Sequence, residues 1–274
     1  MDWRIFVGAI AFLLAIFTPL YFIFIPQLKQ EGVRYPKSKR IKDKKQTRMI
    51  AHRGLSGMYL ENTLQAFEAA GKKSFYGIET DVHVTKDGKF IIVHDDNLRR
   101  VTGQEFVVEE TEYEVLRELR FRDPYTESEE IYRLPSLEEY VNVCKKYDKQ
   151  AILELKNKMR PQEVLAIAKE VEEAGWLERT TFISFAGENL LALRKEYPKA
   201  SAQYLVEKVG KKEISFLEEN RLDCDLKWTA GSKGKIKRLH EKGIKVNCWT
   251  VDSLPCAKVL ISHGIDFITS DIIE

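Results

Sequence analysis

Three acidic side chains stand where they could bind a divalent cation. Glu79 and Asp81 are two residues apart in the run GIETDVHV, so on a strand both would leave the same face. Glu154 and Lys156 repeat this spacing in AILELKNK. Carboxylates buried at strand ends need an opposite charge, and Mg²⁺ or Ca²⁺ would meet that need through oxygen ligands. An ion network, in which Glu79 pairs with Lys156 or Arg53, is equally compatible with the spacing.

Two histidines follow apolar runs and could act as a general acid and a general base. His52 ends the run RMIAH, and His94 ends FIIVH. An imidazole has a pKa near neutrality, which suits it to accept one proton and donate another. Taken singly, each also fits an ordinary turn or core histidine. Arg53 could hold a phosphate through its forked donors, and His83, on the face of Asp81, is a reserve metal ligand only.

These residues lie in short β-rich runs that alternate with helical segments. Such alternation indicates βαβ units and a parallel sheet. The predicted strands are residues 48–52, 76–85, 151–156, 180–185, 201–206, 223–227, 245–251 and 266–270. Helices are predicted between them, at residues 63–73, 161–174, 188–196, 212–220, 233–242 and 254–263. This pattern favours a (β/α)₈ barrel over an open doubly wound sheet, because no G-x-G-x-x-G follows the first strand.

Two features depart from a regular barrel. About 65 residues separate the second and third strands, which is more than one helix requires. This insertion, about residues 86–133, is predicted to start with a short strand at 89–95 and to continue as a polar excursion, before a helix opens at 134–139 with Pro135 near its first turn. Only four residues follow the last predicted strand. We therefore expect part of residues 27–47 to cover the place of an eighth helix.

Charge is distributed unevenly along the chain. The formal net charge of the 274 residues is +2. Residues 29–48 carry nine Lys or Arg against two acidic residues, a local charge of +7, which leaves −5 for residues 49–274. A nucleic-acid-binding domain needs a basic face, so we expect no nucleic-acid partner. The sequence also indicates no obligate protein partner.

The N-terminal segment has the length and polarity of a membrane anchor. The 21 residues from Ile5 to Ile25 carry no charge. As a helix they would reach roughly 32 Å and cross a hydrocarbon core of about 30 Å. A cleaved signal peptide is the alternative, but the run is long and the following PQLK contains no small-x-small cleavage site. We predict a transmembrane anchor at 1–27, a basic linker at 28–47 and a barrel domain at 48–274.

The flanking charge predicts the orientation of this anchor. Positive residues tend to stay in the cytoplasm, and here the excess lies on the C-terminal side of the span. The globular part is thus expected on the cytoplasmic face, with the extracellular face as the alternative. The four cysteines lack C-x-x-C spacing and fit reduced thiols, in agreement with that topology. The basic linker would either contact anionic lipid headgroups or remain solvated.

The chain resembles the glycerophosphodiester phosphodiesterase family over roughly residues 49–271. The motifs that carry this resemblance are HRG at 52–54, ENT at 61–63, IETDV at 78–82, TKDG at 85–88, HD at 94–95, LPSLEE at 134–139, LELK at 153–156, WTVD at 249–252 and GIDFITSD at 264–271. So many ordered motifs are far more specific than any one of them. The resemblance implies a (β/α)₈ barrel with an inserted segment after its second strand.

The resemblance also implies roles for particular residues. The matches are the metal ligands Glu79, Asp81 and Glu154, the acid/base histidines His52 and His94, the phosphate-side basic residues Arg53 and Lys156, and the pocket aromatic Trp249. Without the resemblance, Trp249 would be interpreted as strand core. Two positions depart from the family pattern. Asp252 replaces the usual asparagine after WTV, and Ser270 interrupts the usual final T-D, so both bear on the pocket rim and barrel closure.

These observations predict metal-dependent hydrolysis of a glycerophosphodiester to an alcohol and a glycerol phosphate. An anchor in a bilayer would also suit a lysophospholipid substrate, which would make the enzyme a lysophospholipase D. A different class of function is a catalytically silent, anchored barrel that binds a phosphorylated ligand. The presence of all five metal and histidine positions argues against that class.

Overall fold

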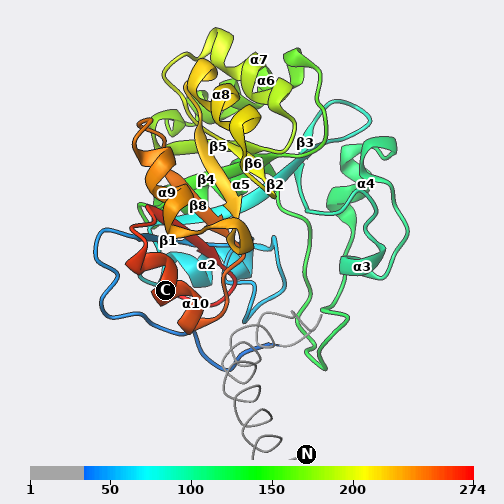
Figure 1. Ribbon diagram of the computed structural model, residues 1–274. Helices are drawn as coiled ribbons and strands as arrows, with labels where there is room; N and C mark the ends of the chain where they lie inside the picture. Colours follow the sequence, from blue (N-terminus) through cyan, green and yellow to red (C-terminus); the bar gives the residue numbers. More distant parts are fainter. Residues whose placement is uncertain (1–33) are drawn as a thin grey trace, which may run out of the picture.

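Eight parallel strands close into a barrel in the computed structural model, which describes residues 34–274 (Figure 1). They are β1 (Arg48–Ala51), β2 (Gly77–Val84), β4 (Gln150–Leu155), β5 (Thr180–Ser184), β6 (Ser201–Val206), β7 (Asp223–Lys227), β8 (Val246–Trp249) and β9 (Phe267–Ser270). Neighbours along the chain are neighbours in the barrel, and β1 pairs with both β2 and β9 to close it. The predicted barrel is confirmed.

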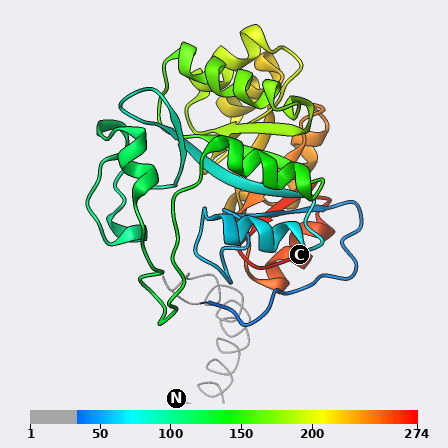
Figure 2. The ribbon, with the colours of Figure 1, turned by 180° about the vertical axis from the view of Figure 1, so that it is seen from behind.

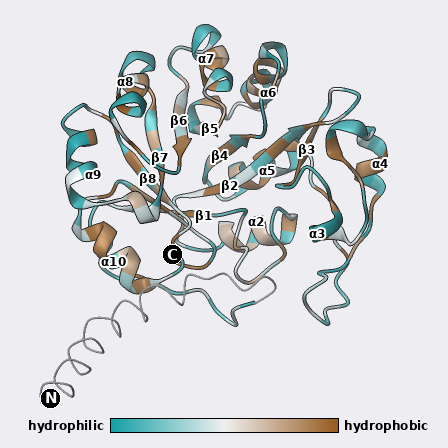
Figure 3. Ribbon diagram, turned by 45° about the vertical axis from the view of Figure 1, so that its right-hand side comes forward, coloured by the Kyte–Doolittle hydropathy of each residue, from teal (hydrophilic) through white to brown (hydrophobic). Residues whose placement is uncertain are grey.

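Helices cover the outside of the barrel. They are α2 (Leu64–Gly71), α5 (Leu137–Lys146), α6 (Pro161–Glu173), α7 (Gly187–Glu196), α8 (Lys211–Asn220), α9 (Lys233–His240) and α10 (Leu254–Ser262). Each turns an apolar side onto the strands, as Phe67, Leu193 and Ile236 do in the main core. Figure 3 shows hydrophobic residues along the strands and long hydrophilic stretches on the outer helices.

The helix expected to open at residues 134–139 begins at Leu137, because Ser136 is its N-cap and forms a capping box with Glu139. Pro135 lies just before the cap, near the first turn. The reciprocal bonds, Glu139 N–H to Ser136 Oγ and Ser136 N–H to Glu139 Oε2, satisfy donors that would otherwise be unpaired.

The insertion between β2 and β4 has an apolar core of its own. Its strand β3 (Phe90–Ile92) pairs antiparallel with β2, as expected. It continues through α3 (Arg99–Thr102), η2 (Val108–Glu110) and α4 (Tyr113–Glu118), and lies beside the barrel (Figures 1 and 2). Its buried side chains, which pack with Leu60 from the loop before α2, are Ile91, Val93, Leu98, Val101, Val108, Leu116, Leu119, Phe121, Tyr132 and Leu134. The prediction of a polar excursion is therefore wrong, because this segment contains buried apolar residues that follow no regular period among its charged residues.

Residues 34–47, here called the N-terminal strap, are packed on the barrel over much of their length. Tyr35 N–H donates to the carbonyl oxygen of Gly57. Lys39 forms a parallel bridge with Ile273, and Ile41 N–H donates to the Glu274 carbonyl oxygen. The Ile41 side chain is buried in the main core. Part of the segment interpreted as a linker is thus held against the residues that follow β9.

Residues 34–274 contain no helix that is both long and apolar enough to cross a membrane. The predicted anchor, residues 1–27, and the first part of the linker lie outside the described residues.

Candidate active site

Three of the predicted site residues meet near the carboxyl ends of β2 and β4. Glu79 and Asp81 leave one face of β2, and Asp81 stands opposite Glu154 of β4 in the strand register. One carboxylate oxygen of each residue lies within 4.8 Å of the other two. All three residues are buried. Oδ1 of Asp81 makes no hydrogen bond, although Nζ of Lys156 is 3.5 Å away.

The pKa values of these carboxyl groups show how strongly they repel one another. Burial, and then the charge of Asp81, raise the pKa of Glu79 well above its usual value. The same two causes raise the pKa of Glu154 to about 7. Burial would raise the pKa of Asp81 as well, but positive neighbours, Arg53 first, hold it below its usual range. A hard divalent cation among these oxygens would relieve the repulsion and use the orphaned acceptor, so the donor set fits Mg²⁺ or Ca²⁺.

Two basic side chains touch the carboxylate cluster. The backbone N–H of Arg53 donates to Oε2 of Glu79 over 2.7 Å, and Nε of Arg53 lies 3.5 Å from Oδ2 of Asp81. Nζ of Lys156 donates to Oε1 of Glu154 over 3.0 Å. The ion network that the spacing also allowed is therefore partly present, but Lys156 pairs with Glu154 and Asp81 instead of Glu79.

His52 follows β1 and is held by the far end of the chain. Its Nδ1 lies 2.6 Å from Oδ1 of Asp271, and Oγ of Ser56 donates to the same carboxylate oxygen over 2.9 Å. Nε2 of His52 lies 4.0 Å from Oε2 of Glu79. A carboxylate at Nδ1 favours the tautomer that carries its proton there, which leaves Nε2 as an acceptor toward the cluster.

The turn after His52 requires glycine at position 54. Gly54 has φ of +76°, and a Cβ there would lie 2.7 Å from the backbone carbonyl carbon of Ala66 in α2. The close approach brings α2 and the loop before it against β2, where Gly54 N–H donates to the Glu79 carbonyl oxygen. The glycine therefore allows the turn to place His52 and Arg53 beside the carboxylates.

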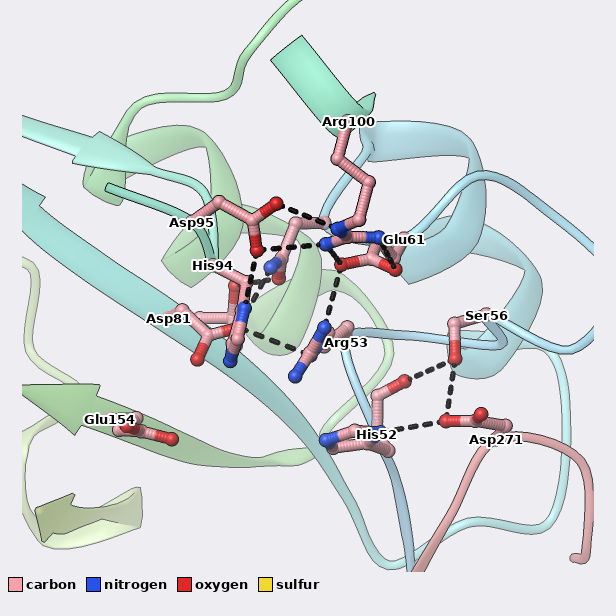
Figure 4. Close-up of polar contacts among 12 residues, drawn as sticks. His52, Arg53, Ser56, Glu61, Asp81, His94, Asp95, Arg100, Glu154 and Asp271 are labelled. Atoms are coloured by element: carbon pink, nitrogen blue, oxygen red, sulfur yellow. Dashed lines mark hydrogen bonds and ion pairs between the residues drawn. The ribbon is translucent and has the colours of Figure 1, made fainter. Parts of the chain in front are cut away.

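His94 belongs to the insertion and is held by a chain of ion contacts (Figure 4). Its Nδ1 lies 2.7 Å from Oδ1 of Asp95, whose other oxygen accepts from Nε of Arg100 over 2.6 Å. Arg100 also donates to both oxygens of Glu61, and Glu61 accepts from Nη1 of Arg53. Burial would raise the pKa of Asp95, but hydrogen bonds from His94 and Arg100 hold it well below its usual range. The network links the insertion to the barrel.

A cavity of about 420 Å³, here called the catalytic pocket, brings the two histidines together. His52, His94 and Arg53 line its charged part, and Tyr125, Trp228 and Trp249 add aromatic surface. In Figure 4 both imidazole rings face the space beside Asp81 and Glu154. The structure therefore gathers all eight predicted site residues, five around the buried carboxylates and three along the pocket wall.

Several residues of the site were not identified from sequence. Asp271 contacts His52, and Nδ2 of Asn62 donates to Oδ2 of Asp81 over 2.8 Å. The motifs ENT and TSD contain these two residues, but nothing in the spacing indicates their partners. His83, the reserve ligand, is buried, with Nε2 3.2 Å from the His94 carbonyl oxygen, and does not join the three carboxylates.

The two departures from the family pattern contact each other. Oδ1 of Asp252 accepts from Oγ of Ser270 over 2.9 Å and from the backbone N–H of Asp271 over 2.8 Å. Oγ of Ser270 in turn accepts the backbone N–H of Ile273 over 2.9 Å. Asp252 and Ser270 therefore support the backbone that carries the partner of His52.

Comparisons with known proteins place these residues in one family's pattern. The sequence model of the glycerophosphoryl diester phosphodiesterase family matches residues 52–274. A glycerophosphodiester phosphodiesterase of Bacillus altitudinis is 28% identical over 231 residues, covering 82% of this chain and 94% of that protein. A lysophospholipase D of Homo sapiens is 37% identical over 83 residues, covering 30% of this chain and 26% of that protein.

A solved structure shows the same likeness in three dimensions. It is an Oleispira antarctica phosphodiesterase in complex with the product sn-glycerol-3-phosphate, with a TM-score of 0.75 and 27% sequence identity. The match covers 82% of this chain and 92% of that chain. The matched family region, which begins at His52, includes both histidines and the three carboxylates.

Proposed function

The chain belongs to the glycerophosphoryl diester phosphodiesterase family and hydrolyses glycerophosphodiesters, and we propose that it does so with a divalent cation held by Glu79, Asp81 and Glu154. It is a phosphoric diester hydrolase, and its proposed products are an alcohol and a glycerol phosphate. The observation that carries the proposal is the convergence of three buried carboxylates beside a pocket that two histidines line. Mg²⁺ and Ca²⁺ are the proposed cations, because both prefer oxygen ligands.

The bound cation supplies positive charge that polarises the phosphodiester and offsets the charge developing on its oxygens. Residues of the chain hold the proposed metal ligands in position. Asn62 holds Oδ2 of Asp81, and the backbone N–H of Arg53 holds Oε2 of Glu79. The side chains of Arg53 and Lys156 add positive potential beside the phosphate, where low solvent exposure strengthens their effect.

Proton transfer is assigned to His52 and His94. One of them removes a proton from the attacking oxygen, and the other donates a proton to the leaving alcohol. Asp271 and Asp95 each contact Nδ1 of one histidine, which keeps that ring oriented and leaves Nε2 for exchange with the substrate. The aromatic surface of Trp249 would flank the substrate in the catalytic pocket.

The test is a metal-dependent substrate panel with the purified full chain. We expect release of glycerol phosphate from glycerophosphocholine or glycerophosphoethanolamine, loss of the activity with a chelator, and recovery with Mg²⁺ or Ca²⁺. No turnover of either diester with either cation would overturn the enzymatic proposal and favour a silent phospho-ligand-binding barrel. A Glu79→Gln variant with full activity would overturn the metal assignment.

A second candidate activity is that of a lysophospholipase D at a membrane. It is supported by the uncharged run from Ile5 to Ile25 and by Tyr125, Trp228 and Trp249 in the pocket wall. We propose that residues 1–27 anchor the chain and that the barrel lies on the cytoplasmic side, as the basic residues 29–48 favour. Hydrolysis of lysophosphatidylcholine in the same panel tests the substrate. Protease resistance of the barrel in sealed right-side-out vesicles tests the side, and digestion from outside would favour the extracellular alternative.

A further inference from the structure

The N-terminal strap forms part of the catalytic pocket. Arg34, the first described residue, lines the pocket. Its Nε and Nη2 donate to Oδ2 of Asp123 over 3.0 and 2.7 Å, and Asp123 is only 4% exposed. Nζ of Lys39 donates to the carbonyl oxygen of Asp252, another pocket residue, over 3.2 Å. The strap is thus fastened to the pocket wall at two places, one on the insertion and one on the barrel.

The length of chain before Arg34 limits where a membrane can lie. Eight residues, 26–33, separate Arg34 from the end of the uncharged run at Ile25. Even a fully extended chain would place Ile25 no more than about 32 Å from Arg34, at up to 3.6 Å for each residue. A bilayer that holds residues 5–25 must therefore come within about 32 Å of Arg34, which lines the catalytic pocket.

One side of the barrel suits that position, and we call it the anchor face. It consists of Arg34, the 122–131 loop, which the Phe121–Tyr132 bridge closes, and α10. Figures 1 and 2 show the loop and α10 at the lower side of the molecule, with α6, α7 and α8 at the opposite end. Arg34 belongs to the same side because it donates to Asp123 of the loop.

The surface chemistry of the anchor face also suits a lipid surface. Ile131 in the loop and Val259 on α10 are 49% and 50% exposed, and Tyr125, between pocket and solvent, is 36% exposed. Beside α10, the exposed basic residues Arg40, Lys42 and Lys258 line a cavity, whereas the 122–131 loop exposes three acidic residues, Glu127, Glu129 and Glu130. Apolar side chains next to basic ones, as on the α10 side, are typical of surfaces that contact anionic lipid headgroups.

We infer that the anchor face lies against the bilayer that holds residues 5–25, so that the catalytic pocket takes its substrate from this surface. The favoured substrate is then a lysophospholipid, an amphiphile whose phosphodiester lies at headgroup level. The aromatic pocket wall would lie near the membrane–water interface, where Trp and Tyr are enriched. This inference rests on the proposed function, because it assigns the source of the substrate for the same site.

The geometry can be tested by site-specific labelling of the full chain. The four native cysteines are buried, so an introduced surface cysteine can be labelled selectively. Fluorophores are attached to Ile131→Cys, Val259→Cys and, as a matched apolar control on α7, Leu191→Cys, whose native residue is 39% exposed. The proteins are reconstituted in phosphatidylcholine and phosphatidylglycerol vesicles that contain headgroup-nitroxide lipid.

We expect quenching at positions 131 and 259 to exceed quenching at 191 by about a factor of two or more, because only the first two would lie at the headgroups. Equal quenching at the three positions, stronger quenching at 191, or failure of the full chain to bind vesicles would overturn the inference.

Activity separates this inference from the proposed function. The double variant Ile131→Glu/Val259→Glu should hydrolyse lysophosphatidylcholine in anionic vesicles roughly tenfold more slowly, since acidic side chains would face an acidic surface. Its hydrolysis of soluble glycerophosphocholine should be unchanged, and Leu191→Glu should affect neither reaction. Unchanged lysophospholipid hydrolysis in the double variant would overturn the inference alone. Absence of glycerophosphocholine hydrolysis in the wild type would instead overturn the proposed function.

Discussion

The catalytic pocket takes one histidine from the barrel and the other from the insertion. A carboxylate contacts each ring in the same way, but the two carboxylates come from different parts of the chain. His52 and His94 both place Nδ1 against a carboxylate, at 2.6 and 2.7 Å. The carboxylate for His52 is 219 residues away in the chain, whereas that for His94 is its neighbour, Asp95. The side chain of His52 is 15% exposed and that of His94 is 32% exposed.

The difference shows which part of the fold each histidine depends on. Asp271 stands opposite His52 only because β9 pairs with β1 and closes the barrel. His94 depends instead on the insertion, which packs its own apolar cluster and meets the barrel through Arg100 and Glu61. Changes at this boundary should therefore alter the site without unfolding the barrel, whereas changes beside His52 should affect both.

The largest loss of activity is expected on the barrel side, at the carboxylate cluster. Glu79→Gln or Asp81→Asn should lower kcat/KM by about 1000-fold or more, because several kcal/mol of charge stabilisation would be lost. Without metal, Glu79→Gln should leave the Tm unchanged or higher, since the amide resembles the protonated carboxyl that the raised pKa of Glu79 favours.

The measurements are kinetics with added cation and thermal unfolding in a chelator. The matched control in the insertion is Glu118→Gln on α4, an exposed acidic residue that should change neither quantity. A large fall in Tm with Glu79→Gln would show that the cluster is primarily an ion network that supports the fold.

Replacing either histidine should lower kcat/KM to a similar extent, although the two histidines come from different regions. His52→Asn and His94→Asn are each expected to lower kcat/KM by about 10²- to 10⁴-fold, the usual contribution of a general acid or base. His240→Asn is the control, because His240 pairs with Asp266 on the surface, away from the pocket. Nearly full activity in one variant would remove that histidine from the reaction and break the comparison.

The barrel could be predicted from sequence because its signals are local. The two-residue spacing of Glu79 and Asp81 requires a shared face of a strand, and short β-rich runs bounded by helical segments mark βαβ units. Position in a parallel barrel then brings Glu154 of the next barrel strand to the same end as Asp81. Geometry of this kind needs no knowledge of distant partners.

The insertion and the supporting residues could not be predicted in the same way. Leu98, Val108 and Leu116 are fully buried, yet they follow neither a helical nor a strand period among their charged neighbours. Asp271 and Asn62 act on partners whose contact with them results from barrel closure and from the turn after β1. Such pairings depend on tertiary structure, so spacing along the chain does not indicate them.

A smaller effect should separate the two supporting carboxylates. Asp271→Asn and Asp95→Asn are each expected to reduce kcat/KM roughly 10- to 100-fold, because the imidazole stays but loses the partner that fixes its tautomer. Only Asp271→Asn should also lower the Tm, since Asp271 accepts from Ser56 and is 3% exposed. Equal falls in Tm would show that the insertion supports the barrel as strongly as barrel closure does.

The last prediction concerns stability and lies inside the barrel, at Asp225 on β7. Asp225 is 1% exposed, its Oδ1 has no hydrogen-bond partner among the described residues, and burial raises its pKa to about 7. Between the unfolded pKa of about 4 and this value, the folded chain binds more protons than the unfolded chain, so stability must fall as pH rises through that range.

Asp225→Asn should remove this loss, because the amide has no proton to release. At pH 8 we expect a gain of about 2 to 4 kcal/mol in the free energy of unfolding, for a shift of about three pKa units at 1.4 kcal/mol each. At pH 4 the variant and the wild type should differ little. Denaturant unfolding at both pH values checks this, with the exposed Asp148→Asn as control. A gain of the same size at both pH values would mean that packing, and not ionisation of Asp225, limits the stability of the barrel interior.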